Sequence, residues 1–181
     1  ENIPSTKQYI FPNSQKEKKW KDIIDRSKIN IGIAWKTKKN VQVQARSIEL
    51  DNFNEISSLN NVSLYSLQIF DAEDEIKNKN PNLDLHIFNK DFDNDAPFID
   101  TAAVIKNLDL VITIDTSIAH LAGALGCKTF LLLSDKPHWT WMLDKVDTPW
   151  YPSFKIYRKS KNQDWANVFN KIKTDLEEIK K

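Results

Sequence analysis

The chain has 181 residues, of which 40% are hydrophobic and 28% are charged, and its formal net charge is +1. This composition is typical of a soluble globular domain with a core of its own, and the near-neutral charge gives no electrostatic reason to expect nucleic acid or a membrane surface as the main partner. No apolar run approaches the ~20 residues that a membrane-spanning helix needs. A single cysteine, Cys127, excludes an internal disulfide, so we expect a reducing compartment, the cytoplasm. Because the sequence begins with Glu1 rather than Met, we expect a piece of a longer polypeptide.

Residues 1–28 are predicted to form a polar lead-in that ends in a short helix from about Glu17. Beyond this segment, nearly continuous apolar runs alternate with helical patterns. We expect strands at 29–35, 62–68, 84–88, 109–114 and 128–134, and a short edge strand at 155–158. We expect helices at 50–59, at 101–108 with Asp100 as the N-cap, after the strand that ends at 114, and at about 164–179, where Val168, Ile172, Leu176 and Ile179 recur at helical spacing.

Strands that alternate with helices of this length indicate βα units and a parallel sheet covered by helices on both faces. The predicted fold class is therefore α/β with a Rossmann-like sheet. We divide the chain into the lead-in at 1–28, a Rossmann-like domain at 29–162 and a C-terminal amphipathic helix at 163–181.

The stretch "ITIDTSIAHLAGALG", from Ile112 to Gly126, passes from strand to helix without an obvious loop. Ligands of open α/β sheets bind beyond the carboxyl ends of the strands, and the free amides of a helix N-terminus at that edge suit a phosphate. Asp115, Thr116 and Ser117 stand at this junction and are candidate phosphate-binding residues. The alternative is that Asp115 or Ser117 only caps the helix.

Helical spacing also separates two faces of this predicted helix. One face is apolar and should pack on the sheet, and it comprises Ile118, Leu121, Ala122 and Leu125. His120 lies on the opposite face among small residues, Gly123 included, where an exposed helix would show Lys and Glu. We therefore expect another domain or a ligand to approach closely there, with His120 lining the site. The alternative is an interior histidine with satisfied hydrogen bonds.

Cations and aromatic residues follow other predicted strands at the same edge. Lys36 comes directly after the first strand, and Arg46 ends the basic loop behind it, so both are candidates for phosphate contact. The alternative for each is a solvated surface charge. In the loop from Ser134 to Ser153, Trp139 and Trp141 are candidates for stacking on a base or a sugar, whereas we expect Trp150 and Tyr151 to hold the loop on the domain.

Several other chemistries are not supported by the sequence. There is no G-x-G-x-x-G after the first strand, no Walker A motif, no zinc-ligand spacing and no G-x-S-x-G element. We therefore expect neither a dinucleotide cofactor nor a bound metal.

Motifs along the chain, in order, are "IGIAWK", "RSIEL", "YSLQ", "DTAAVIKNLDLVITIDTSIAHLAGALG", "FLLL", "HWTWMLD", "TPWYPS" and a late "DW". Between Ile29 and Trp165 the chain thereby resembles the C-terminal part of bacterial glycosyltransferase-like proteins that often carry tetratricopeptide repeats. It is more distantly similar to lipopolysaccharide heptosyltransferases and O-GlcNAc transferases. One departure is the segment "KTKKNVQVQA", which has no glycine where the family usually has a Gly- and Asn-rich loop.

The resemblance implies the C-terminal half of a GT-B fold, in which two Rossmann-like domains face a cleft. It implies that Asp115, Thr116 and Ser117 hold the diphosphate and ribose side of a nucleotide-diphosphate sugar, that His120 lines the cleft, and that Lys36 meets the phosphates. Arg46 matches the family's R-S element. The donor is a substrate, and no further cofactor is implied, because the helix dipole and the cations stabilise the leaving diphosphate.

The resemblance also implies partners outside this chain. A general base for the acceptor usually comes from the N-terminal domain, and 181 residues are too few to contain that domain in full. The expected partner is therefore this missing N-terminal domain, together with the tetratricopeptide repeats that family members often carry. The leading hypothesis is thus the donor-binding half of a glycosyltransferase. Two alternatives stay open: a non-catalytic module that binds a nucleotide sugar or packs against repeats, and an epimerase of the GT-B fold.

Overall fold

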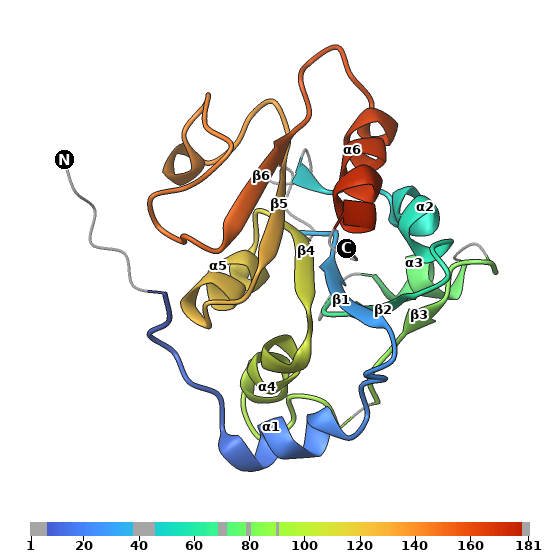
Figure 1. Ribbon diagram of the computed structural model, residues 1–181, viewed down its shortest axis with the longest axis vertical. Coiled ribbons are helices and arrows are strands. Elements are labelled where there is room, and N and C mark those ends of the chain that lie inside the picture. Colours follow the sequence, from blue (N-terminus) through green and yellow to red (C-terminus); the bar gives the residue numbers. More distant parts are fainter. Residues whose placement is uncertain (1–6, 38–45, 69–71, 79–80, 90, 179–181) are drawn as a thin grey trace.

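The computed structural model of the chain describes residues 7–37, 46–68, 72–78, 81–89 and 91–178. In these residues, parallel strands form one six-stranded sheet in the order β3-β2-β1-β4-β5-β6. The strands are β1 (Ile29–Ala34), β2 (Val62–Ser66), β3 (Leu85–His86), β4 (Leu110–Ile114), β5 (Thr129–Leu133) and β6 (Phe154–Arg158), seen in Figure 1. The predicted α/β fold class is confirmed, and every strand lies where the sequence predicts one.

The four inner strands are buried on both faces, apart from partly exposed Ile29 at the start of β1. This burial explains why β1, β4 and β5 are nearly continuous apolar runs, whereas β2 also buries Ser63 and Ser66. The edge strand β6 differs in having exposed Lys155 between buried Phe154 and Ile156. Edge strands with charged side chains resist pairing with other chains.

Helices cover both faces of the sheet (Figure 1). One layer contains the 3-10 turn η2 (Leu50–Phe53), α2 (Asn54–Ser57), α3 (Glu73–Lys77) and α6 (Trp165–Glu178), and the other contains α1 (Ser14–Lys21), α4 (Ile99–Asn107) and α5 (Ser117–Ala124). The single helix predicted at 50–59 is thus η2 followed by one α-helical turn, and α3 was not predicted. The final helix α6 buries Val168, Ile172 and Leu176 as predicted, whereas Ile179 lies outside the described residues.

The lead-in segment packs on α4 through Trp20. Its helix α1 begins at Ser14 rather than near Glu17, because the side chain of Asn13 accepts hydrogen bonds from the first amides. The indole Nε1 of Trp20 donates to Asp100 over 2.6 Å, and the ring of Trp20 meets Phe88 edge-on. The division of the chain at residues 28 and 162 stays a prediction.

The prediction that Asp100 caps α4 is wrong. The cap comes from Asp93, whose carboxylate accepts from the backbone amides of Asp100 and Thr101 over 2.6 and 3.0 Å. Asp100 is fully buried and instead accepts from Trp20 and Lys16. Burial acts to raise the pKa of Asp100, but these hydrogen bonds hold it below its ordinary value. Its carboxylate therefore joins α1 to α4.

Within the described residues, no helix has the length and apolarity needed to cross a lipid bilayer.

Candidate functional site

The strand order places the candidate site at a reversal in the sheet. From β1 the chain builds outward through β2 and β3, and it then returns to the other side of β1 with β4. The two strands pair in parallel, with Ala34 beside Thr113, so they end side by side. Doubly wound sheets bind ligands at such a switch point, outside the carboxyl ends of the strands. Lys36 follows β1 there, and Asp115 follows β4.

The helix α5 begins at this switch point without a side-chain cap. Thr116 is its N-cap residue, in an extended conformation, and within the described chain no side chain accepts a hydrogen bond from the first amides. The structure therefore contradicts the alternative in which Asp115 or Ser117 only caps the helix. Ser117 is exposed and Thr116 is half-buried. The amides of Ser117 and Ile118 and the positive end of the helix dipole thus face the edge of the sheet.

Arg46 and Asp115 form an ion pair at this corner. The guanidinium Nη1 lies 2.9 Å from the Asp115 Oδ2, and the side chain of Asp115 is only 8% exposed. Arg46 is held near β1 because Ile48 donates its amide to the carbonyl of Trp35 over 2.9 Å, and the Ser47 hydroxyl accepts from the amide of Thr37. The sequence predicts each residue as a phosphate ligand but not the contact between them. The residues 38–45, in which the glycine-free departure from the family lies, are outside the described residues.

Lys36 is engaged elsewhere in this structure. Its ammonium lies 2.9 Å from the carboxylate of Glu75, which also accepts from the Trp35 indole and from the Leu50 amide. Burial acts to raise the pKa of Glu75, but these donors hold it below its ordinary value. Gln68 fixes the backbone here, because its Oε1 accepts from the amides of Trp35 and Lys36. The phosphate-binding role of Lys36 stays a prediction that requires this ion pair to open.

His120 is exposed, but only one face of its ring is free. The other face stacks on Trp141, with ring centroids 5.1 Å apart and planes at 23°, and its Nδ1 lies 2.9 Å from the Tyr151 hydroxyl. Loss of water around the imidazole lowers its pKa below the ordinary value, although Asp115 acts in the opposite direction. The Tyr151 bond engages Nδ1, so Nε2 is the ring nitrogen left for a ligand.

The small residues of α5 face the chain itself. A Cβ on Gly123 would lie 2.4 Å from the Tyr151 ring, and Ala119 is buried with Trp141, Tyr151 and Phe154. The expectation that another domain or a ligand covers this face is therefore wrong, because the loop after β5 covers it. Tyr151 holds the loop on the domain, as predicted.

The stacking role predicted for Trp141 is also contradicted. Trp141 is 1% exposed and lies between His120 and Phe154, so neither of its faces is open to a base or a sugar. Trp139 is 74% exposed and remains a candidate for stacking. Trp150 donates its indole N–H to the carbonyl of Thr140 over 3.0 Å, which ties the two ends of the loop together.

The structure thus brings Arg46, Asp115, Thr116, Ser117 and His120 to one corner. Sequence reasoning missed Tyr151 as the partner of His120. A signal was present, since glycine and histidine three residues apart on one helix leave room for a ring beside the imidazole. Among the described residues, no group of three or more His, Cys, Asp or Glu side chains is arranged to hold a metal ion.

No family model matches this chain. A curated relative, Protein FlbA of Caulobacter vibrioides, is 26% identical over 183 residues, which cover 99% of this chain and 30% of FlbA. The crystal structure of a glycosyl transferase family 9 protein from Veillonella parvula superposes with a TM-score of 0.60 at 9% identity, over 93% of this chain and 47% of that one. The C-terminal domain of LpcC, a glycosyl transferase group 1 family protein from Francisella tularensis, gives a TM-score of 0.51 at 13% identity, over 97% of this chain and 87% of that one.

These relatives are longer than the present chain, which spans 30% of FlbA and 47% of the Veillonella protein. At 9% and 13% identity, the likeness to solved structures concerns the fold. The chain has the Rossmann-like α/β fold of glycosyltransferase domains, which confirms at the level of the fold the resemblance that its motifs carry.

Proposed function

We propose that this chain is the donor-binding domain of a glycosyltransferase and binds a nucleotide-diphosphate sugar at the β1–β4 switch point. The observation that carries the proposal is the uncapped N-terminus of α5 at that point, with Arg46 2.9 Å from Asp115 beside it. The amides of a helix N-terminus and an arginine fork together suit a diphosphate.

The start of α5, Arg46 and His120 each have a role in this proposal. The amides of Ser117 and Ile118 donate to phosphate oxygens, and Arg46 adds positive charge. His120 donates from Nε2 while Nδ1 accepts from the Tyr151 hydroxyl, 2.9 Å away. When the sugar leaves, charge develops on the diphosphate, and fixed donors stabilise it without rearrangement. We therefore expect transfer to need no bound metal, with the acceptor's general base supplied by a part of the protein outside these residues.

Titration of UDP, GDP and ADP, followed by NMR, tests the site. We expect weak binding, with dissociation constants from high micromolar to millimolar, roughly −4 to −6 kcal/mol, because one domain offers half of a cleft. The amides of Thr116, Ser117 and Ile118 should shift first. If another region shifts to saturation while these amides stay unchanged, the proposed site is wrong.

A single substitution can separate the helix terminus from the rest of the corner. Thr116→Asp adds a capping carboxylate that competes with phosphate for the same amides, so it should stabilise α5 and abolish diphosphate binding. Asn13→Asp makes the same change of charge at the N-cap of α1, where Asn13 already accepts from the first amides, and should leave binding unchanged. Equal binding by both variants would contradict the proposal.

A further inference from the structure

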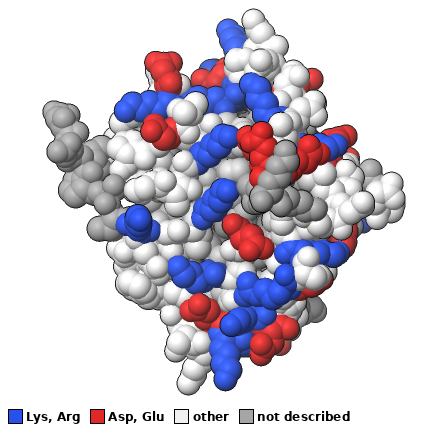
Figure 2. All heavy atoms as spheres, in the orientation of Figure 1, with Lys and Arg blue, Asp and Glu red and all other residues white. Residues whose placement is uncertain are grey.

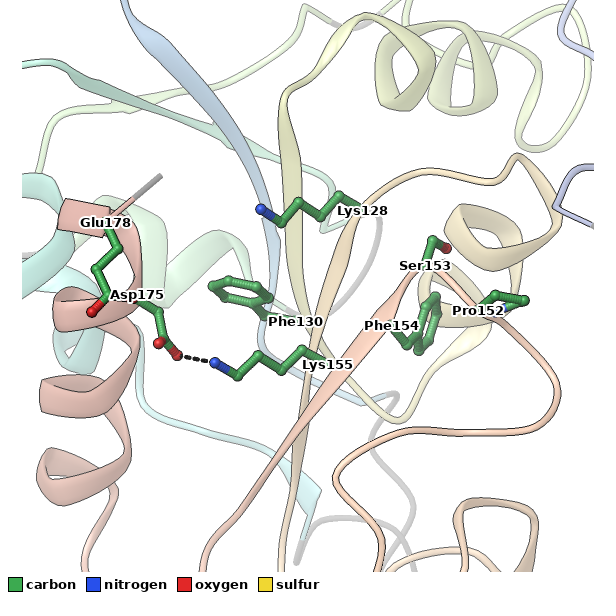
Figure 3. A pocket seen from close by; sticks show the side chains of 8 residues that line it. All are labelled: Lys128, Phe130, Pro152, Ser153, Phe154, Lys155, Asp175 and Glu178. Atoms are coloured by element: carbon green, nitrogen blue, oxygen red, sulfur yellow. Dashed lines mark hydrogen bonds and ion pairs between the residues drawn. The ribbon is translucent and has the colours of Figure 1, made fainter. Parts of the chain in front are cut away.

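A groove follows the edge strand β6 where α6 passes beside it. Lys155 of β6 and Asp175 of α6 form an ion pair of 2.6 Å across this groove and divide it into two cavities. The first cavity, about 380 Å³, lies at the start of β5 and β6, where Lys128, Phe130 and Lys155 point to the side on which Asp175 lies (Figure 3). The second, about 560 Å³, lies at the other side of the ion pair, and we call it the outer cavity.

The outer cavity is lined by both apolar and cationic side chains. Val146 is the exposed one of the three aliphatic residues in this lining, whereas Ile156 and Val168 are buried, and Lys145, Arg158 and Lys171 supply the charge. Figure 2 shows Lys and Arg side chains gathered in a row on the face of the molecule that carries β6 and α6. The volume falls within the roughly 300–1,000 Å³ of small-molecule sites.

In the lining of the outer cavity, positive charge exceeds negative charge. Lys145 and Lys171 are exposed and are in no ion pair with any of the described residues. The Arg158 guanidinium donates to the neutral backbone carbonyls of Lys145 and Trp141, over 3.1 and 2.6 Å. Asp175 is neutralised by Lys155, which leaves Asp144 as the one carboxylate of the lining without an ion pair in the described chain.

The wall of the cavity is fixed to the sheet. The amide of Ile156 donates to the carbonyl of Val146 over 2.7 Å, and Arg158 holds the carbonyls of Lys145 and Trp141, which precede Val146 in the same loop. The Val146 side chain is nevertheless 73% exposed, in a position where an apolar ligand would cover it. A fixed wall means that little conformational entropy is lost when a ligand binds.

We propose that the outer cavity binds a small amphipathic anion, with an apolar body against exposed Val146 and one carboxylate, sulfonate or phosphate head group against Lys145, Arg158 and Lys171. An inorganic anion would leave the apolar surface exposed, and a neutral apolar ligand would leave the cations without a counter-charge. This site lies at the edge strand, two strands from β4, and is independent of the proposed donor site.

The test uses 8-anilinonaphthalene-1-sulfonate as the amphipathic anion. N-phenyl-1-naphthylamine has nearly the same apolar body without the charge, and sulfate has the charge without the body. We expect one molecule of the sulfonate dye to bind per folded chain, with each of the other two at least tenfold weaker. NMR should place the dye at the amides of Val146, Lys171 and Thr174.

Matched variants complete the test. Lys145→Ala with Lys171→Ala should weaken dye binding at least tenfold, and Val146→Ser should weaken it several-fold. Lys18→Ala with Lys161→Ala removes the same charge from exposed positions outside the cavity and should change nothing. The proposal is overturned if both double variants bind alike, if the uncharged dye binds as tightly, or if the shifted amides lie around exposed Trp139 and Leu143. Unchanged amide spectra of the free variants show that each is folded.

Discussion

The buried carboxylate of Asp115 depends on Arg46 for its counter-charge, since its Oδ2 lies 2.9 Å from the Arg46 Nη1 and the Asp115 side chain is 8% exposed. Arg46→Gln should therefore lower the free energy of unfolding by about 1–3 kcal/mol, the cost of a buried charged group without its partner. The same variant should weaken diphosphate binding about tenfold, because one charge-assisted contact is lost. Urea unfolding and nucleotide titration measure the two effects.

A double-mutant cycle separates the ion pair from other effects at Arg46. Asp115→Asn removes the charge that Arg46 neutralises, so Arg46→Gln should cost much less in that background. If Arg46→Gln costs as much in the Asp115→Asn background as in the unsubstituted chain, the contact with Asp115 does not stabilise the corner. If it costs almost nothing in either background, Arg46 is a solvated surface charge, as the alternative interpretation has it.

His120 should give the corner a pH dependence of definite sign. Its pKa in the folded chain lies below the ordinary value of about 6.5, with water exclusion by its neighbours as the main cause. As the pH falls below about 6.5, the unfolded chain therefore binds more protons than the folded chain does. His120 thus lowers the free energy of unfolding below about pH 6.5 and has no such effect at higher pH. A ring titration by NMR should show a pKa below that of the urea-unfolded chain, and His120→Gln should reduce the slope of stability against pH between about 5 and 6.5. An equal or higher pKa in the folded chain would contradict this.

The position of His120 could be predicted from the sequence, whereas its surroundings could not. Helical spacing alone places His120 opposite Ile118 and Ala122, and in the structure it is exposed while both of those are buried. The hydrogen bond between His120 and Tyr151, 31 residues apart in sequence, depends on how the loop after β5 returns over α5. The spacing of His120 and Gly123 leaves room for a ring, but it does not show that Tyr151 supplies that ring, which is why the sequence predicts another domain or a ligand on this face.

At the scale of the element, α5 should be sensitive to a single methyl group. Alanine is a better helix former than glycine by about 1 kcal/mol, so Gly123→Ala would stabilise an isolated helix. In this chain the new Cβ would lie 2.4 Å from the Tyr151 ring, so the loop must move, and we expect a net loss of about 1–3 kcal/mol in the free energy of unfolding.

Removal of the Tyr151 ring is the control for this prediction. In a Tyr151→Ala background the space is open, so Gly123→Ala should become neutral or stabilising. Urea unfolding of the four proteins gives the coupling energy. If Gly123→Ala has the same effect in both backgrounds, Tyr151 is not the reason for glycine in α5.

The elements differ in how well local sequence specifies them. Strands β1, β4 and β5 were predictable because burial on both faces favours a nearly continuous apolar run. The short helix α3 lies in a polar stretch and is held by long-range contacts, among them the bonds from Lys36 and Leu50 to Glu75. The cap of α4 comes from Asp93, six residues before the helix begins, which cap motifs counted from the helix start do not reveal.

At the scale of the whole molecule, the position of the candidate site follows from strand order. Alternating strands and helices predict a parallel sheet, but they do not say on which side of β1 each new strand is added. The observed order makes β1 and β4 neighbours and so brings Arg46, from the loop after β1, to Asp115, after β4. Residues 69 positions apart thereby form one site, although neither is notable alone.

A domain that holds only the donor should bind without transferring. We expect UDP, GDP or ADP, at ten times its dissociation constant, to raise the free energy of unfolding of the chain by about 1.4 kcal/mol, since the ligand binds the folded state alone. The same chain should release no nucleoside diphosphate from UDP-, GDP- or ADP-sugars when acceptors are supplied. The chain spans 47% of the Veillonella protein, and in our proposal the general base lies in a part of the protein outside this chain. The thermal or urea measurement shows that the protein is folded and has nucleotide bound, so a lack of turnover cannot be due to an unfolded sample.

Sustained turnover by residues 1–181 would place a general base within this chain. Stabilisation lost in Thr116→Asp but kept in Asn13→Asp would assign the binding to the start of α5, whereas no stabilisation by any nucleotide would contradict the donor-binding proposal itself.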